Sequence, residues 1–384
     1  MGVRGSLAMT LGIVIIVALT AAKPTPSPSP APTPTPSPPP ASSGGWSIVS
    51  SPNPDPSNNR LEGVAVVTSA DAWAVGSAGS NALTEHWDGS HWSVVPTPMA
   101  PGASQEGLVS AAAVAGNDVW AVGWSSNTYG WSTLSMHWNG SQWTIVPTPN
   151  APVGPTGPAL NSVVAVASND VWAVGGSYKA LGNYPGKALL EHWDGVGWSI
   201  VQPPAGTGSW SSSSRFGAAA VSSNDVWAVG DYDSFNWNGN AWNVVFGAQS
   251  VVAASAAGAT SIWAVGSYTS YDGYTYSGPF TLAYRWDGTA WRYSQSLSPT
   301  GDDTFAGVAA ISSTDVWAVG SSQGFTLAEH WNGSSWSVVG TPNASPNSDR
   351  LDAVAANASN NVWAVGSYLT SGGLRLTLIE HFTG

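Results

Sequence analysis

The stretch Asp71-Ala72-Trp73-Ala74-Val75-Gly76, followed by Trp87-Asp88-Gly89-Ser90-His91-Trp92, decides the fold because both parts recur along the chain. The intervals between successive copies of the Trp-Ala-Val-Gly core are 47, 52, 55, 36, 54 and 46 residues. The second part, Trp-Asp/Asn-Gly-x-x-Trp, follows six of the seven copies. Self-similarity at such a period is typical of a repeat architecture. The seven cores begin at Trp73, Trp120, Trp172, Trp227, Trp263, Trp317 and Trp363.

Each repeat unit predicts four β-strands, which we call strands A to D. Strand A is small and apolar, as in 64–67, and strand B is the Trp-Ala-Val-Gly segment. Strand C ends in a group such as Glu85-His86-Trp87, and strand D begins at Trp92. The Asp-Gly or Asn-Gly pair between them favours a type I′ hairpin turn, in which both residues have positive φ. Four strands at this period indicate a β-propeller blade.

The seventh unit lacks strand D, because the chain stops at Gly384 just after Glu380-His381-Phe382. The missing strand is found at the other end of the domain, as Trp46-Ser47-Ile48-Val49. We therefore predict that residues 45–384 form an all-β, seven-bladed β-propeller with four antiparallel strands per blade. The N-terminal strand completes the last blade and hides its free edge. Because strand B places Trp and Val on one face and Ala and Gly on the other, each small face should receive its neighbour's indole.

The N-terminal segment predicts export. Leu7 to Ala22 is an apolar run of 16 residues behind Arg4, which suits a cleaved signal peptide over residues 1–22, with an uncleaved N-terminal anchor as the alternative. Residues 23–44 form a linker rich in Pro, Ser and Thr that favours polyproline II. Both alternatives predict a secreted or cell-surface protein. If the N-terminal segment is not cleaved, it is the only part of the protein that we expect to contact a membrane.

The composition excludes several classes of function. The 384 residues include no Cys, which excludes a disulfide scaffold, a zinc ribbon, an iron–sulfur site and a thiol nucleophile. A net charge of -12 argues against a nucleic-acid partner. We expect no cofactor and a monomer.

The paired motifs resemble a group of secreted bacterial propellers built from Val-Trp-Ala-Val-Gly and His-Trp-Asn-Gly repeats, and are more distantly similar to Kelch-type and WD-type propellers. The resemblance covers residues 45–384 and implies the architecture, but no established activity. Related architectures include lectins, interaction scaffolds, sialidases and a copper oxidase, so fold says little about function. A copper-radical oxidase would need a cysteine beside its tyrosine, and the turns here depart from the Asp-box usual in sialidases.

Loop variation predicts which face of the propeller carries a site. The A–B and C–D turns are short and nearly identical between units, whereas the B–C and D–A loops differ in length and chemistry. Exposed Trp and Tyr suit sugar or protein recognition. The alternative is that these aromatic residues pack long loops against one another. The candidates on this face are Trp124, Tyr129, Trp131, Tyr178, Tyr184, Trp210, Tyr271 and Tyr274.

Three arginines are candidates for a site at the mouth of the central channel. Arg60 and Arg350 stand thirteen residues before the core Trp of blades 1 and 7, and Arg215 sits one position later in blade 4. Guanidinium groups bind carboxylates bidentately, so these residues could hold an anion. In the alternative, Arg60 and Arg350 pair with the nearby acids Glu62 and Asp352 and stabilise the closure seam.

The sequence predicts no metal site. Five of the six histidines share one repeat position, one per blade, so they should not converge on zinc. Asp302-Asp303 is a weak candidate for a loop calcium. The Asn-Gly-Ser sequons at Asn139 and Asn332 are better interpreted as hairpin turns.

We expect a binding module that recognises a glycan or a protein through the B–C/D–A face, without catalysis. The first alternative is a hydrolase or lyase that acts on polysaccharide at the channel mouth. The second is a structural surface spacer.

Overall fold

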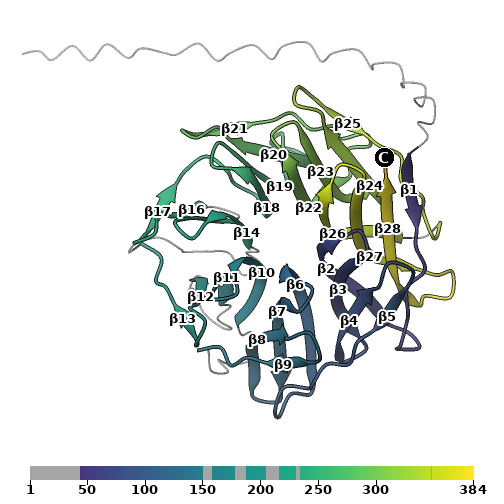
Figure 1. Ribbon diagram of the computed structural model, residues 1–384. Coiled ribbons are helices and arrows are strands. Elements are labelled where there is room, and N and C mark those ends of the chain that lie inside the picture. Colours follow the sequence, from purple (N-terminus) through teal and green to yellow (C-terminus); the bar gives the residue numbers. More distant parts are fainter. Residues whose placement is uncertain (1–43, 150–157, 178–186, 205–215, 231–233, 347) are drawn as a thin grey trace, which may run out of the picture. The chain divides into compact units, whose positions relative to one another are not determined.

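The computed structural model describes residues 44–149, 158–177, 187–204, 216–230, 234–346 and 348–384. These residues form seven four-stranded antiparallel sheets arranged as blades around a central axis (Figure 1). The prediction of an all-β, seven-bladed propeller is confirmed. The predicted signal peptide and all but the last residue of the predicted linker lie outside the described residues. No helix among the described residues is long and apolar enough to cross a membrane.

Every blade is built from strands that follow one another in the chain, except for one strand of the last blade. The innermost strands are β2 (Asn59–Thr68), β6 (Gln105–Ala115), β10 (Pro158–Ala167), β14 (Phe216–Ser222), β18 (Val251–Gly258), β22 (Asp303–Ser312) and β26 (Ser348–Ala358). The second strands are β3 (Asp71–Ala78), β7 (Asp118–Asn127), β11 (Asp170–Ser177), β15 (Asp225–Gly230), β19 (Ser261–Tyr271), β23 (Asp315–Ser322) and β27 (Asn361–Leu369). The third strands are β4 (Asn81–Trp87), β8 (Gly130–Trp138), β12 (Lys187–Trp193), β16 (Ser234–Trp237), β20 (Tyr276–Trp286), β24 (Phe325–Trp331) and β28 (Arg375–Thr383). The outermost strands are β5 (Trp92–Val94), β9 (Trp143–Ile145), β13 (Trp198–Ile200), β17 (Trp242–Val245), β21 (Trp291–Tyr293), β25 (Trp336–Val338) and β1 (Gly45–Ile48).

The ring closes through β1, as predicted. This strand pairs antiparallel with β28 of the last blade and places Trp46 opposite Phe382. Beyond the strand, the Arg375 N–H donates to the Ser57 carbonyl over 2.9 Å, which ties the first connecting segment to the start of β28. The two ends of the domain therefore share one blade (Figure 1).

The core lies between blades and is built on indole contacts. Trp73 of blade 1 meets Trp143 of blade 2 edge-on, with ring centroids 5.3 Å apart and an interplanar angle of 88°. Trp73 and Val75 pack against Val119 and Ala121 of the next blade, which confirms the predicted division of strand B into a large and a small face. Equivalent T-shaped pairs close the other six interfaces: Trp46–Trp317, Trp92–Trp363, Trp120–Trp198, Trp172–Trp242, Trp227–Trp291 and Trp263–Trp336.

The hairpins between the third and fourth strands differ from the predicted type I′ turn. In blade 1, Trp87 pairs with Trp92 across four residues, and only Gly89 has positive φ, at 95°. The carboxylate of Asp88 accepts the backbone N–H groups of Ser90 and His91 at 2.8 and 2.9 Å. The side chain thus replaces the backbone bond that a two-residue turn would need. Asn139 and Asn332 accept the same bonds, so both sequons are hairpin turns as predicted.

Candidate binding site at the mouth of the central channel

One bulge near the start of most inner strands shapes the candidate site. In blade 1 the pairing passes from Leu61–Gly76 to Gly63–Val75, which leaves Glu62 without a cross-strand partner. The closing glycine of the Trp-Ala-Val-Gly core makes this bulge possible, because a Cβ on Gly76 would collide with the Arg60 carbonyl oxygen. Bulge residues at the same register in other described blades are Val109, Asn161, Val252, Ala306 and Asp352.

Four of these bulge residues line a single pocket of about 210 Å³. They are contributed by four consecutive blades, as Asp352, Glu62, Val109 and Asn161. Because alternate residues of a strand point the same way, the residues two positions upstream in three blades complete the wall: Arg350, Arg60 and Ala159. The eighth lining residue is Trp124, near the end of β7. Since inner strands begin and second strands end here, the pocket opens on the B–C/D–A face.

The side of the pocket formed by blades 7 and 1 is charged. Arg60 Nε lies 2.7 Å from Glu62 Oε1 and donates to the Ser77 hydroxyl over 3.0 Å. Arg350 Nε donates to Asp352 Oδ2 over 3.0 Å. The predicted pairing with nearby acids is confirmed, within each blade. The side chains of Arg60 and Arg350 are nevertheless 34% and 42% exposed, so both remain accessible at the mouth.

Arg375, at the start of β28, is a third cation in this region that sequence reasoning missed. Its Nη1 donates to the Ser367 hydroxyl over 3.2 Å, and Ser367 pairs directly with Arg350 across the strands. Burial, followed by the positive charges of Arg350 and Arg60, lowers the pKa of Arg375. The only sequence signal that could have indicated Arg375 is its rarity: it is one of 10 basic residues in the chain and lies in a segment that differs between the repeat units.

The side of the pocket formed by blades 2 and 3 is largely apolar. The Trp124 indole packs over Gly107, where an added Cβ would lie 3.1 Å from the ring. Trp131 leans on Trp124 with a centroid distance of 4.6 Å and is half-buried. The two predicted tryptophans therefore lie together, and Trp124 faces the pocket. Asn161 Oδ1 is buried and has no hydrogen-bond partner among the described residues.

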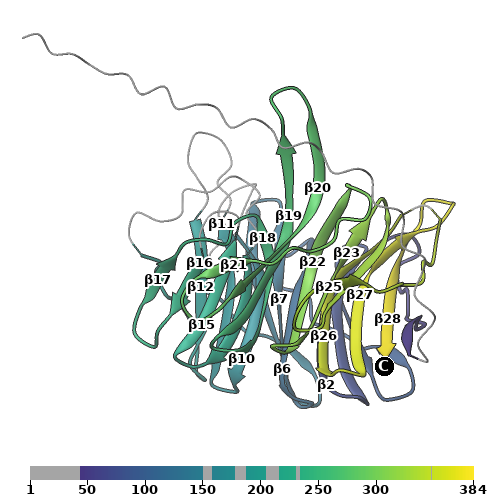
Figure 2. The same ribbon diagram turned by 90° about the horizontal axis from the view of Figure 1, so that it is seen from above.

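The other aromatic candidates among the described residues do not line this pocket. Tyr271 and Tyr274 belong to the hairpin of β19 and β20, which projects beyond the other strands of the ring (Figure 2). Blade 5 lies across the ring from blade 2 (Figure 1), so the aromatic candidates that the structure describes form two separate groups. Tyr274 is 93% exposed, and Tyr271 stacks on Tyr276 at 4.6 Å. Tyr129 is 83% exposed at the β7–β8 turn.

Four predicted site residues lie outside the described residues: Tyr178, Tyr184, Trp210 and Arg215. The register of blade 4 still explains the one-position offset of Arg215. Phe216 pairs with Gly230 as Leu61 pairs with Gly76, but Gly217 follows at once opposite Val229. Blade 4 therefore lacks the bulge residue, and Arg215 precedes Phe216 in the sequence as Arg60 precedes Leu61.

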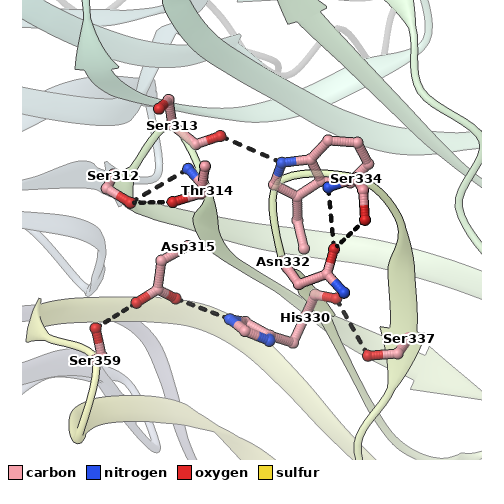
Figure 3. Close-up of polar contacts among 10 residues, drawn as sticks. Ser312, Ser313, Thr314, Asp315, His330, Asn332, Ser334, Ser337 and Ser359 are labelled. Atoms are coloured by element: carbon pink, nitrogen blue, oxygen red, sulfur yellow. Dashed lines mark hydrogen bonds and ion pairs between the residues drawn. The ribbon is translucent and has the colours of Figure 1, made fainter.

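The repeated histidines each find a partner within their own blade, at the opposite end of the strands. His330 Nε2 lies 2.8 Å from Asp315 Oδ1, and the Ser359 hydroxyl of the next blade donates to the other oxygen of Asp315 (Figure 3). This is not a nucleophilic triad, because there the histidine must lie between the serine and the carboxylate. His86, His137 and His192 pair with their own Asp, and His381 with Asn361.

The glutamates that precede four of these histidines are fully buried: Glu85, Glu191, Glu329 and Glu380. Burial raises the pKa of Glu85 to about 8, and both of its carboxyl oxygens lack a hydrogen-bond partner among the described residues. Among the same residues no three His, Asp or Glu side chains are grouped to hold a metal ion. The calcium candidate Asp303 instead closes a turn by accepting the N–H groups of Thr300 and Gly301.

Comparison with known proteins adds evidence on the fold. The chain has the fold of YCF48. It superposes on a solved structure described as YCF48 bound to D1 peptide with a TM-score of 0.55 and 16% sequence identity, covering 88% of this chain and 97% of that one. YCF48 from Cyanidioschyzon merolae gives a TM-score of 0.54 and 14% identity, with 88% and 98% covered. No protein-family model and no curated protein matches the chain.

Proposed function

We propose that this protein is a binding module that recognises a segment of another protein at the B–C/D–A face. The observation that carries the proposal is the pocket at the channel mouth, which joins accessible guanidinium groups to the indole of Trp124. Tryptophan, tyrosine and arginine are the side chains enriched among residues that dominate the energy of protein interfaces, and the pocket holds two of these three types. The likeness to YCF48, whose solved structure is described as bound to a peptide, adds support.

The pocket is preorganised for recognition. Its lining residues sit on strands rather than on long loops, and the arginines are held by Glu62, Asp352 and Ser77. Little conformational entropy is therefore lost at these side chains when a partner binds. The face around the pocket supplies further contacts that differ from blade to blade.

An array of random twelve-residue peptides would test the proposal against the purified protein. We expect a subset of peptides to bind, and Trp124→Ala to weaken that binding by about tenfold or more. Arg292→Gln is the matched surface control, because Arg292 is 65% exposed in blade 5 and contacts only Asp287 in the ion pairs of the described residues. Failure of every peptide to bind, or equal loss in both variants, would contradict the proposal.

A second candidate, glycan binding, is favoured by the tyrosine hairpin. Tyr271, Tyr274 and Tyr276 are 57%, 93% and 77% exposed, and exposed aromatic rings suit stacking against sugars. A glycan array read with the parent and with Tyr274→Ala would detect this activity. Binding lost in Tyr274→Ala but kept in Trp124→Ala would assign a glycan to the hairpin and leave the pocket to protein.

The proposal includes export, because it places the propeller outside the cytoplasm behind the apolar segment 7–22. Fractionation of cells and N-terminal sequencing of the mature protein would test it. The alternative of a polysaccharide hydrolase or lyase predicts release of reducing sugar or of unsaturated ends by the purified protein. The alternative of a surface spacer predicts neither binding nor turnover.

A further inference from the structure

The described residues that line the pocket carry two positive and two negative charges, and Arg375 beside them adds a third positive charge, although the protein as a whole is acidic. The whole chain has 10 basic and 22 acidic residues. Arg60 and Arg350 line the pocket, and Arg375 lies beside it because it donates to Ser367, which pairs with Arg350 across the strands. Burial, followed by the positive charges of Arg350 and Arg60, lowers the pKa of Arg375. Only Glu62 and Asp352 oppose them in the pocket lining. The region is therefore suited to a ligand that brings one more negative charge.

The geometry of the ion pairs leaves the binding ends of the guanidinium groups available. Arg60 and Arg350 both engage their acids through Nε. Neither donates from its terminal Nη atoms to another described residue. A planar guanidinium presents its donors in a fork that matches the two oxygens of a carboxylate. The acids thus fix the arginines in place without occupying all their donors.

The opposite wall of the pocket offers a different chemistry. Val109, Ala159 and Trp124 provide an apolar surface, and Asn161 lies among them. The volume of about 210 Å³ is below the range of ordinary small-molecule pockets. It suits the end or one side chain of a peptide better than a chain of sugars.

We propose that the pocket binds a carboxylate group of the partner protein, carried next to an apolar side chain; this rests on the proposed function. The carboxylate accepts from Arg60 and Arg350, and Arg375 adds to the positive field. The apolar group packs on Trp124. A peptide C-terminus and an Asp or Glu side chain both supply this carboxylate.

The test is one peptide array made in two forms that differ only at the last group, a free C-terminal carboxylate or an amide. Peptides with and without internal Asp or Glu are compared within the amidated form. We expect binding to fall at least about tenfold when the only carboxylate is removed. If amidation alone abolishes binding, the pocket binds the C-terminal carboxylate. If binding is lost only when Asp or Glu is removed from the peptide, the pocket binds a side-chain carboxylate.

The arginine variants provide the second readout. Arg60→Gln and Arg350→Gln should each reduce binding of the acidic peptides by about tenfold. Arg292→Gln makes the same charge change in blade 5 and should leave binding unaltered. Peptides without any carboxylate that bind as tightly as their acidic counterparts would overturn this inference and leave the proposed function standing. If the protein binds neither the random peptides nor the peptides with free or amidated C-termini, both this inference and the proposed function are refuted.

Discussion

Glu85 offers a direct test of the electrostatics between blades, through the substitution Glu85→Gln. Its carboxyl group lies on β4, is fully buried, and has no hydrogen-bond partner among the described residues. Burial disfavours the charged form and raises the pKa of Glu85 from 4.5 to about 8. In the folded protein near neutral pH, this group therefore keeps its proton.

The magnitude follows from proton linkage. Between its unfolded and folded pKa values, unfolding releases the proton of Glu85, so the free energy of unfolding falls by about 1.4 kcal/mol per pH unit. By pH 7 the accumulated loss is about 3 kcal/mol. Glutamine has nearly the same shape and no proton to release. We expect Glu85→Gln to be more stable than the parent by about 2–3 kcal/mol near pH 7 and equal to it near pH 4.

Urea denaturation followed by tryptophan fluorescence at a series of pH values measures this difference. Asp302→Asn removes an exposed carboxylate and serves as the control. A Glu85→Gln protein that is no more stable than the parent near pH 7 would refute the reasoning. So would a gain of the same size at both ends of the pH range, because that would reflect packing rather than protonation.

Three further outcomes follow from the structure. Burial raises the pKa values of Glu85, Glu329 and Glu380 to about 8, so the free energy of unfolding of the parent should fall as the pH rises from 5 to 8, measured by the same denaturation series. Asp315→Asn should lower the free energy of unfolding by less than about 1 kcal/mol, because an asparagine, Asn361, already binds the equivalent His381 at 2.7 Å in blade 7. Asp315→Leu should lower it by about 2 kcal/mol, because His330 then loses its hydrogen-bond partner. Gly76→Ala should cost more than about 2 kcal/mol and lower the thermal midpoint, because its Cβ would collide with the Arg60 carbonyl oxygen.

The architecture could be predicted because its determinants repeat. Seven copies of one motif give the number of blades, the alternation of large and small residues along strand B gives the interface, and the displaced Trp46 strand gives the closure. Local geometry was harder to predict. The predicted type I′ turn at Asp88 was wrong. The Asp88 side chain accepts the backbone N–H groups of the turn, and only Gly89 has positive φ, whereas a type I′ turn needs two residues with positive φ.

The pocket could be predicted only in part, because it is built from residues that differ between units. Arg60, Arg350 and Trp124 were candidates on chemical grounds. That Glu62, Val109 and Asn161 would face the same cavity depends on a bulge, which shifts the register by one residue. Its trace in the sequence is the one-position offset of Arg215 in blade 4, where the bulge is absent. The glycine that ends each Trp-Ala-Val-Gly core allows the bulge to form, and the residue at the bulge, which differs from blade to blade, determines the chemistry of the pocket wall.

The charged side of the pocket lies where the two ends of the domain meet, so closure and binding should be coupled. Arg350, Asp352 and Arg375 belong to blade 7, whose outermost strand is β1. Trp46 packs β1 against Trp317, and Trp291 packs β21 against Trp227 in the same geometry far from the pocket.

Trp46→Ala and Trp291→Ala should therefore each lower the free energy of unfolding by about 3–5 kcal/mol. Only Trp46→Ala should also weaken binding of the acidic peptides, because a frayed β1 loosens β28 and its Arg375. Equal peptide affinity in both variants, measured where both remain folded, would show that the closing strand stabilises the ring without shaping the site.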